Sequence, residues 1–191
     1  MKVVDVFGDL PKLETERLYL RKVHMDDAPS IFNYGTNEQV TKYVTWDTYS
    51  SMEDAIDFIQ FAQNRYKKKQ IAPWGIVFKK DNRFIGTVDF VSWQPEHKSA
   101  EIGYVISQNY WGRGIATEAV NKVIEYGFSN MDLVRIQAFC FVENIGSARV
   151  MEKAGMTFEG IIRKKLLIKG IHRDVKLYSI LREEYISTNK K

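Results

Sequence analysis

The segment from Glu101 to Glu118 constrains the fold more than any other part of this sequence. It begins with the largely apolar run 101–106 and passes through a polar stretch to glycines at positions 112 and 114. Apolar residues then recur at helical spacing, at Ala116, Ala119, Val120, Val123, Ile124 and Phe128. This order predicts a strand, a tight turn and an amphipathic helix. A second apolar run over 133–141 completes a strand–helix–strand unit, which we expect to be a right-handed parallel crossover.

Two helices are predicted ahead of this unit, after a short first strand at 18–21. Asp26 and Asp27 mark the start of the first helix, because acidic side chains favour the positive end of the helix dipole. Ser50 and Glu53 form a capping-box pattern at the start of the second helix. Its apolar stripe should end near the three lysines at 67–69.

The remaining segments predict antiparallel strands and one more helix. Residues 74–78 and 84–90 predict a hairpin, and Asn144 opens a short helix that Gly155 terminates. Three strands should close the chain, at 158–162, 166–168 and 175–180. We expect a tight turn at Lys169-Gly170 to join the last two. The predicted fold class is α/β (α+β), with helices packed on one mixed sheet.

Composition bounds the kind of protein. With 191 residues, 45% of them hydrophobic, and no repeat or linker inside the chain, we expect a single domain over 1–191. The net charge of +4 arises from charged residues spread along the whole chain, which implies no specific nucleic-acid binding. No run approaches the roughly 18 apolar residues of a membrane span, and the first residues lack the order of a signal peptide. We therefore expect a cytoplasmic protein with no membrane partner.

The glycine turn has the properties of a diphosphate-binding loop. A diphosphate needs several main-chain N–H groups directed at one place; glycine lets the backbone approach closely, and a helix N-terminus adds a positive dipole end. The amides available for this are those of Gly112, Arg113, Gly114, Ala116 and Thr117. Taken alone, two glycines are equally compatible with a tight turn that binds nothing. The spacing fits neither the dinucleotide-binding glycine pattern nor the P-loop.

Several motifs, in one order along the chain, resemble the GNAT superfamily of N-acetyltransferases. The superfamily's diphosphate loop is matched by Tyr110-Trp-Gly-Arg-Gly-Ile-Ala-Thr-Glu-Ala119. Further matches are Leu13-Glu-Thr-Glu-Arg-Leu18, Asn144-Ile-Gly-Ser-Ala-Arg-Val-Met-Glu-Lys-Ala-Gly155 and Glu159-Gly-Ile-Ile-Arg163. The resemblance covers nearly the whole chain and is strongest to the branch that contains the ribosomal-protein N-terminal (alanine or serine) acetyltransferases.

This resemblance implies a GNAT-like fold, in which a mixed and mostly antiparallel sheet contains a splayed pair of parallel strands. It also implies acetyl-CoA as co-substrate and no metal ion. The pantetheine arm would lie along Tyr104, Val105 and Ile106 like an added strand, with the amide near Ile106 donating to the thioester oxygen. Asn144 matches a pantetheine contact, although its position also suits a plain helix N-cap.

The resemblance further implies a primary amine as acceptor and direct attack on the thioester. A peptide α-amine has a pKa of about 7.7 to 8, so it is mostly protonated at neutral pH and needs a base. Glu101 is the first candidate and Asp89 the second, although either position also suits an ordinary surface carboxylate. Ser147 matches the acid suggested for the ribosomal-protein branch, and we expect it to stabilise the departing thiolate. Met151 stands where many relatives have a tyrosine.

Three functions remain open at this point. The first is acetylation of a protein N-terminal α-amine, with a ribosomal protein as the expected acceptor. The second is acetylation of a polyamine or other small amine, because the tail 168–176 also resembles that related group. The third is a non-catalytic acyl-CoA-binding module. The protein is expected to be a monomer or a homodimer.

Two other kinds of site are not expected. The chain's three histidines lack metal-ligand spacing, and no Cys/His cluster accompanies them, so no metal site is predicted. The single cysteine, Cys140, cannot form an internal disulfide. It lies in an apolar strand with no histidine related to it in sequence, so a packing role is expected rather than that of an acyl-accepting nucleophile.

Overall fold

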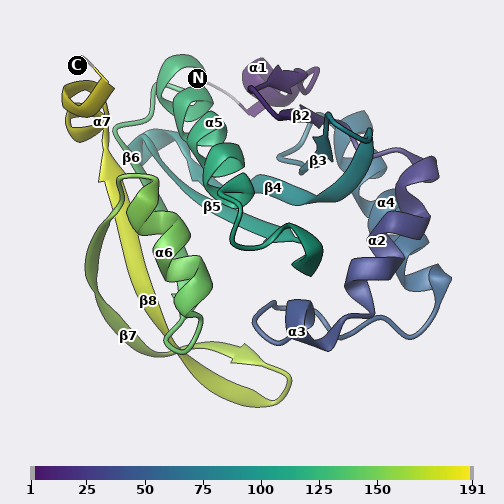
Figure 1. The fold of residues 1–191 in the computed structure, drawn as a ribbon. Coiled ribbons are helices and arrows are strands. Elements are labelled where there is room, and N and C mark those ends of the chain that lie inside the picture. Colours follow the sequence, from purple (N-terminus) through teal and green to yellow (C-terminus); the bar gives the residue numbers. More distant parts are fainter. Residues whose placement is uncertain (1–2, 190–191) are drawn as a thin grey trace.

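The computed structural model describes residues 3–189, in which helices pack on one eight-stranded sheet (Figure 1). The strand order is β1-β2-β3-β4-β5-β6-β8-β7. The strands are β1 Leu13–Glu14, β2 Leu18–Arg21, β3 Trp74–Phe78, β4 Arg83–Gln94, β5 Ser99–Ile106, β6 Arg135–Phe141, β7 Thr157–Ile168 and β8 Ile171–Leu181. All neighbouring pairs are antiparallel except β5 and β6. The predicted fold class, a mixed and mostly antiparallel sheet flanked by helices, is confirmed.

The helices bury two apolar clusters, one on each face of the sheet. The α-helices are α1 Val3–Phe7, α2 Ala28–Gly35, α3 Glu38–Thr41, α4 Met52–Lys67, α5 Ile115–Asn130, α6 Ile145–Lys153 and α7 Arg182–Asn189. The larger cluster joins α5 and α6 to strand residues such as Ile76, Ile102 and Ile106. The smaller joins α2 and α4 to residues of opposite strand parity, such as Val77 and Val105. We call these the α5/α6 face and the α2/α4 face.

The two parallel strands separate soon after they begin. β5 and β6 pair only at Ser99–Arg135, Ala100–Ile136 and Glu101–Gln137. Beyond this point the register of β5 continues with β4 alone, and that of β6 with β8 alone. The splayed pair implied by the family resemblance is therefore present, and α5 connects its two strands as predicted (Figure 1).

The capping box of α4 lies one residue later than predicted. Its N-cap is Ser51 and its third residue is Asp54, in place of the expected Ser50 and Glu53. The Asp54 carboxylate accepts from the amides of both serines, at 2.7 Å from Ser50 N and 2.9 Å from Ser51 N. Two adjacent serines followed by two adjacent acids fit the pattern in either register, and the shorter aspartate side chain makes the bonds.

The closing segment is one long hairpin instead of three separate strands. The predicted strands 158–162 and 166–168 belong to a single irregular strand, β7. Its register shifts at Lys164, which has a φ of 50° and whose amide donates to Asp174 Oδ1 at 2.8 Å. The tight turn to β8 lies at Lys169 and Gly170, whose φ values of 50° and 74° suit a two-residue hairpin turn.

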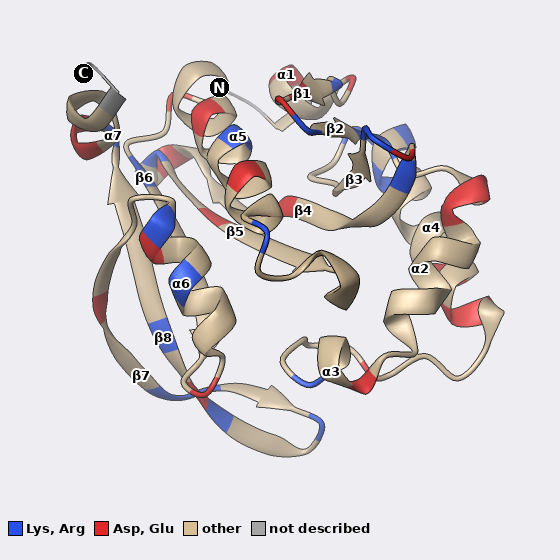
Figure 2. Cartoon of the chain, in the orientation of Figure 1, with Lys and Arg blue, Asp and Glu red and all other residues tan. Residues whose placement is uncertain are grey.

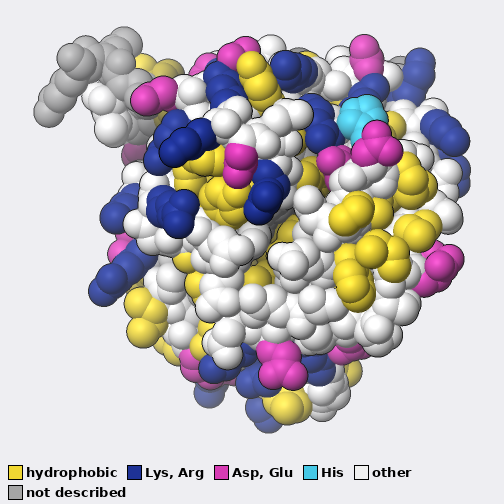
Figure 3. Space-filling model, turned by 45° about the vertical axis from the view of Figure 1, so that its right-hand side comes forward, with side chains coloured by type: hydrophobic (Ala, Val, Ile, Leu, Met, Phe, Trp, Pro, Cys, Tyr) yellow, Lys and Arg dark blue, Asp and Glu magenta, His cyan; other side chains and the backbone are white. Residues whose placement is uncertain are grey.

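The surface carries charges of both signs. On the face shown in Figure 3, Lys and Arg side chains form several separate groups with Asp and Glu among them. Within the described part of the chain, no helix is long and apolar enough to cross a membrane.

Candidate active site

The glycine turn between β5 and α5 presents a row of main-chain amides without partners. Gly112 and Gly114 have φ values of 72° and 73°, and Gly114 is the N-cap of α5. Both take the left-handed conformation, which glycine adopts without steric cost. The amides of Tyr110 and Trp111 bond back to nearby carbonyls. By contrast, no amide from 112 to 117 donates to another residue within 3–189. The five predicted amide donors therefore remain available to an anion at the positive end of α5.

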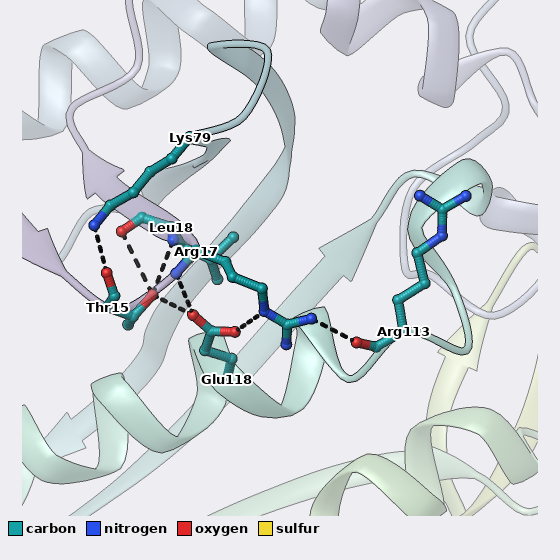
Figure 4. A network of polar contacts seen from close by, with 6 residues as sticks. All are labelled: Thr15, Arg17, Leu18, Lys79, Arg113 and Glu118. Atoms are coloured by element: carbon teal, nitrogen blue, oxygen red, sulfur yellow. Dashed lines mark hydrogen bonds and ion pairs between the residues drawn. The ribbon is translucent and has the colours of Figure 1, made fainter.

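A network of hydrogen bonds and an ion pair connects this turn and the start of α5 to the segment before β2 (Figure 4). Glu118 of α5 accepts from Thr15 Oγ1 at 2.6 Å, from Arg17 N at 2.9 Å and from Arg17 Nε at 2.6 Å. Arg17 Nη1 donates to the carbonyl oxygen of Arg113 at 2.9 Å. Burial would raise the pKa of Glu118, but the hydrogen bonds from Thr15 and Arg17 bring it below its usual value. Sequence reasoning recognised the motif that contains Arg17 but not its contact with the loop.

A cavity of about 720 Å³ adjoins the same helix end. It extends along α5 from Gly114 to Glu125, and it is also lined by the segment before β2, the end of α6, β8 and α7. Its charged lining has both signs, with Lys122 and Lys153 beside Glu14, Glu16, Glu118 and Glu125.

The open edge of β5 offers further main-chain donors. The amide of Ser107 donates to Ile85 of β4 at 2.8 Å, so the alternate residues Tyr104 and Ile106 direct their amides to the opposite side, where β6 has moved away. The Trp111 indole bonds to the Ile106 carbonyl at 2.7 Å on this open side. The main chain of Val105 faces β4 instead. Of the three residues implied to hold the pantetheine arm, Tyr104 and Ile106 have amides that point toward the open edge.

The first turn of α6 faces this edge across the separated strands. Asn144 is the N-cap, with Oδ1 accepting from Ser147 N at 3.0 Å, while its Nδ2 makes no hydrogen bond within the described chain. The capping role is therefore confirmed and a free donor remains. Ser147 Oγ lies 2.9 Å from the Tyr104 hydroxyl, which also donates to the Ser147 carbonyl at 3.1 Å. Burial raises the pKa of Tyr104, so its hydroxyl stays protonated. Sequence reasoning assigned only the backbone of Tyr104.

The two candidate bases lie together on the α2/α4 face. Glu101 is at the last paired position of β5 and β6, and burial raises its pKa, partly offset by a hydrogen bond from Gln137 and by Lys165. Asp89 pairs with Gly103, and its Oδ1 lies 3.6 Å from where a side-chain carbon of Gly103 would be. Burial raises the pKa of Asp89 to about 7, with Arg65 opposing. A carboxylate with a pKa near neutrality is suited to accept a proton.

Cys140 packs in the core, as predicted. It is buried on β6, and burial raises the pKa of its thiol to about 11, so it carries no thiolate at neutral pH. Within residues 3–189, no group of three or more His, Cys, Asp or Glu is arranged to hold a metal ion.

Free amides at a helix N-terminus, an open strand edge and a carboxylate across it together define an acyltransferase that uses a CoA thioester. Residues 17–157 match the family model of the acetyltransferase (GNAT) domain, and the chain belongs to this family. It is an acetyl-CoA-dependent N-acetyltransferase, as the sequence resemblance implied.

Relatives along nearly the whole chain agree with this assignment. The chain is 38% identical over 172 residues to the Bacillus subtilis protein YoaA, named an uncharacterized N-acetyltransferase, with 90% of this chain and 97% of that protein covered. A crystal structure of a Bacillus anthracis acetyltransferase of the GNAT family is 32% identical, with a TM-score of 0.80 and coverages of 91% and 99%. The microcin C7 self-immunity acetyltransferase MccE, solved with acetyl-CoA and AMP, is 26% identical, with a TM-score of 0.78 and coverages of 87% and 93%.

Proposed function

We propose that the enzyme acetylates the N-terminal α-amine of a protein, with a ribosomal protein as the expected acceptor. The observation that carries the proposal is the place of Glu101. It sits where β5 and β6 separate, on the face opposite to the loop and α6, and burial raises its pKa. An amine that arrives from the α2/α4 face can therefore be deprotonated beside a thioester that is held from the α5/α6 face.

Each residue then has a stated task in the reaction. The amides from 112 to 117 bind the diphosphate, and Asn144 with the β5 edge holds the pantetheine arm. Glu101 takes a proton from the ammonium group, directly or through one water, and the free amine nitrogen forms a bond to the thioester carbon. The amide of Ile106 donates to the oxygen that becomes negative. As the C–S bond breaks, sulfur takes the electron pair and Ser147 donates a hydrogen bond to it. The second proton of the nitrogen then passes to the departing thiolate through solvent, which leaves the neutral amide and the CoA thiol.

Direct attack is favoured over an acyl-enzyme because the chain offers no suitable nucleophile at this place. The thiol of Cys140 is buried and protonated, and the charged groups that act on its pKa are Lys176 and Glu152, not a histidine. A cysteine that accepts an acyl group needs a low pKa or an adjacent base.

Two relatives have names that refer to different classes of acceptor. YdaF of Bacillus subtilis, whose name refers to ribosomal N-acetylation, is 34% identical over 105 residues, or 55% of this chain. A spermidine N(1)-acetyltransferase of Vibrio cholerae is 25% identical over 174 residues, or 91% of this chain. Polyamine acetylation is therefore the second candidate, and Met151, at the place of the tyrosine found in many relatives, weighs against it.

The acceptor is tested by following thiol release from acetyl-CoA with a panel of N-terminal peptides, polyamines and aminoglycosides. Peptide turnover without polyamine turnover would support the proposal, and turnover of polyamines alone would overturn it.

The role of Glu101 is tested by the pH profile of Glu101→Gln. General-base catalysis contributes roughly 10²- to 10⁴-fold, so we expect a loss of about 10²-fold that is largest at low pH, where the amine is most fully protonated. Acetyl-CoA affinity, measured by calorimetry, should not change. The same substitution at Asp89 is the comparison: a profile that changes only in Asp89→Asn would transfer the base to that residue, and an unchanged profile in Glu101→Gln would exclude Glu101.

A further inference from the structure

Arg173 of β8 is a cation without a partner. Its Nε is buried with no hydrogen bond, and no hydrogen bond or ion pair of its side chain occurs within the described chain. Three other arginines, in contrast, each hold a carboxylate: Arg17 with Glu118 at 2.6 Å, Arg21 with Asp27 at 2.8 Å and Arg135 with Glu159 at 2.6 Å. A half-buried guanidinium without a carboxylate partner is suited to bind an anionic group of a ligand.

Arg173 belongs to a pair of cations over an aromatic surface. Its guanidinium carbon lies 5.9 Å from the ring centroid of Phe141, and Lys165 Nζ lies 5.8 Å from that of Phe139. Both rings project to the α2/α4 face, because the alternate residues of β6 belong to the cluster on the other face. Gln137, which pairs with Glu101, is on the same side of the same strand. The cations therefore continue along the sheet face from which the amine reaches Glu101.

The hairpin that carries these cations is held in place over β6. Lys169 Nζ donates to the carbonyl of Thr41 at 3.0 Å, which joins the hairpin turn to the end of α3. Tyr43, just beyond α3, meets the Phe141 ring edge-on with a centroid distance of 6.2 Å. Figure 2 shows most of the basic residues of this region on the β7–β8 hairpin, where acidic residues also occur, and acidic residues on β4 and β5.

We infer that the acceptor is a peptide whose N-terminal amine is followed closely by an acidic side chain, which Arg173 and Lys165 bind. The inference rests on the proposed function and specifies its substrate class. A carboxylate would form an ion pair with the guanidinium group of Arg173, while Asp89 and Glu101 attract the ammonium group. A polyamine would bring its second and third positive charges against the same two cations, and like charges repel at this distance.

The spacing along β6 sets where the acidic residue lies in the peptide. Phe139 and Phe141 are two and four residues beyond Gln137, which corresponds to about 7 and 13 Å along a strand. An extended peptide advances by the same amount per residue. Because the amine belongs to the first residue, the acidic side chain is expected at the third to fifth position of the acceptor.

The test compares three amidated pentapeptides that begin with serine and carry two Asp, two Asn or two Lys residues at positions three and four. We expect kcat/KM to be at least tenfold higher for the Asp peptide than for the Lys peptide, with the Asn peptide between them. Added salt should reduce the difference, because it screens charges. Spermidine should be a poorer acceptor than the Asp peptide.

The substitution Arg173→Gln should bring the three peptides within about threefold of one another without changing acetyl-CoA affinity. Arg163→Gln, which removes an exposed arginine of β7, is the control and should keep the preference. Equal turnover of the three peptides by the unsubstituted enzyme, or a preference that survives Arg173→Gln, would overturn the inference while leaving peptide acetylation intact. Acetylation of spermidine but of none of the peptides would overturn both.

Discussion

The hydroxyl groups of Tyr104 and Ser147 form a pair whose proton arrangement matters for catalysis. They lie 2.9 Å apart, and either oxygen can be the donor. The Tyr104 hydroxyl has one proton and donates it to the Ser147 carbonyl at 3.1 Å, so in this geometry Ser147 Oγ donates to Tyr104 Oη. For Ser147 to donate to the departing sulfur, its proton must turn away from Tyr104 Oη. Tyr104 can then turn its own proton from the carbonyl to Ser147 Oγ. Because burial raises the pKa of Tyr104, this proton stays on the tyrosine, and we propose that Tyr104 orients Ser147 through this exchange.

The substitution Tyr104→Phe is expected to lower kcat by about three- to tenfold, which is the effect of one neutral hydrogen bond. The KM for acetyl-CoA should change less than twofold, because the amide of residue 104 is retained. Ser147→Ala should give a loss at least as large. The double variant should be no slower than Ser147→Ala, since Tyr104 acts through the serine. Losses that multiply in the double variant would show instead that the two residues act separately.

Single residues of the candidate site can be predicted from the sequence where a local pattern or a motif marks them. Glu101 and the amides of the glycine turn could be singled out because strand placement and glycine spacing are local properties, whereas Ser147 was identified through the family resemblance. The Tyr104 hydroxyl, the Gln137 partner of Glu101 and the unpaired Arg173 could not. Each depends on contacts between residues more than 30 positions apart, or on burial, and neither is encoded in a local pattern.

Among the elements, the segment before β2 acts as a support for the cofactor loop. Arg17 bridges the loop and the helix that follows it, through the carbonyl of Arg113 and the carboxylate of Glu118 in α5. The hydrogen bond from Arg17 fixes the Arg113 carbonyl on the side of the segment before β2. The amides of the glycine turn make no bond to that segment and remain available to a ligand. The support should therefore matter for binding acetyl-CoA and not for the chemical step.

The substitution Arg17→Gln should raise the KM for acetyl-CoA about tenfold and change kcat less than twofold, the pattern expected when an interaction is equal in the ground and transition states. Arg17→Lys should recover little of the affinity, because one ammonium group cannot make both contacts. Lys67→Gln, at the exposed end of α4, is the control. A loss of kcat with unchanged KM in Arg17→Gln would contradict this role.

Element prediction succeeded where apolar periodicity is long and failed where it is short. The order β5, glycine turn, α5 and β6 was predicted, and so was the end of α4 near its lysines. The helices α1 and α3 have five and four residues, too few to establish a stripe, and the eight residues of α7 are mostly polar. β7 was divided into two strands because the irregularity at Lys164 interrupts the alternation of its side chains, although the hydrogen-bonded pairing with β8 resumes beyond it.

The fold places the groups of the proposed mechanism on the two faces of one sheet. In that mechanism the loop, α5 and α6 bind the cofactor on one face, and the carboxylates and the β7–β8 hairpin bind the acceptor on the other. This arrangement depends on the insertion of β8 between β6 and β7, which leaves β6 paired with β8 where it has parted from β5. Local patterns predict strands but not their order, so only the family resemblance anticipated the splayed pair.

The carboxyl group of Asp89 is buried on the α2/α4 face, where its ionisation is unfavourable. Its ionisation therefore changes the free energy of unfolding of the whole protein. Burial raises its pKa from 3.8 to about 7, so the folded protein retains a proton that the unfolded chain has already released above pH 4. The free energy of unfolding should therefore fall between about pH 4 and pH 7 and level off above that range. A shift of about three pKa units corresponds to a loss of up to about 4 kcal/mol.

The substitution Asp89→Asn removes this dependence, because the amide does not ionise. In urea unfolding experiments the variant should match the unsubstituted protein near pH 4 and exceed it by a growing margin up to pH 7 to 8. Asp57→Asn, on an exposed turn of α4, controls for the change in net charge. A difference between Asp89→Asn and the unsubstituted protein that stays constant from pH 4 to pH 8 would contradict the raised pKa. A growing difference, together with slower acetylation by Asp89→Asn, would mean that the active site keeps this carboxylate at the expense of stability.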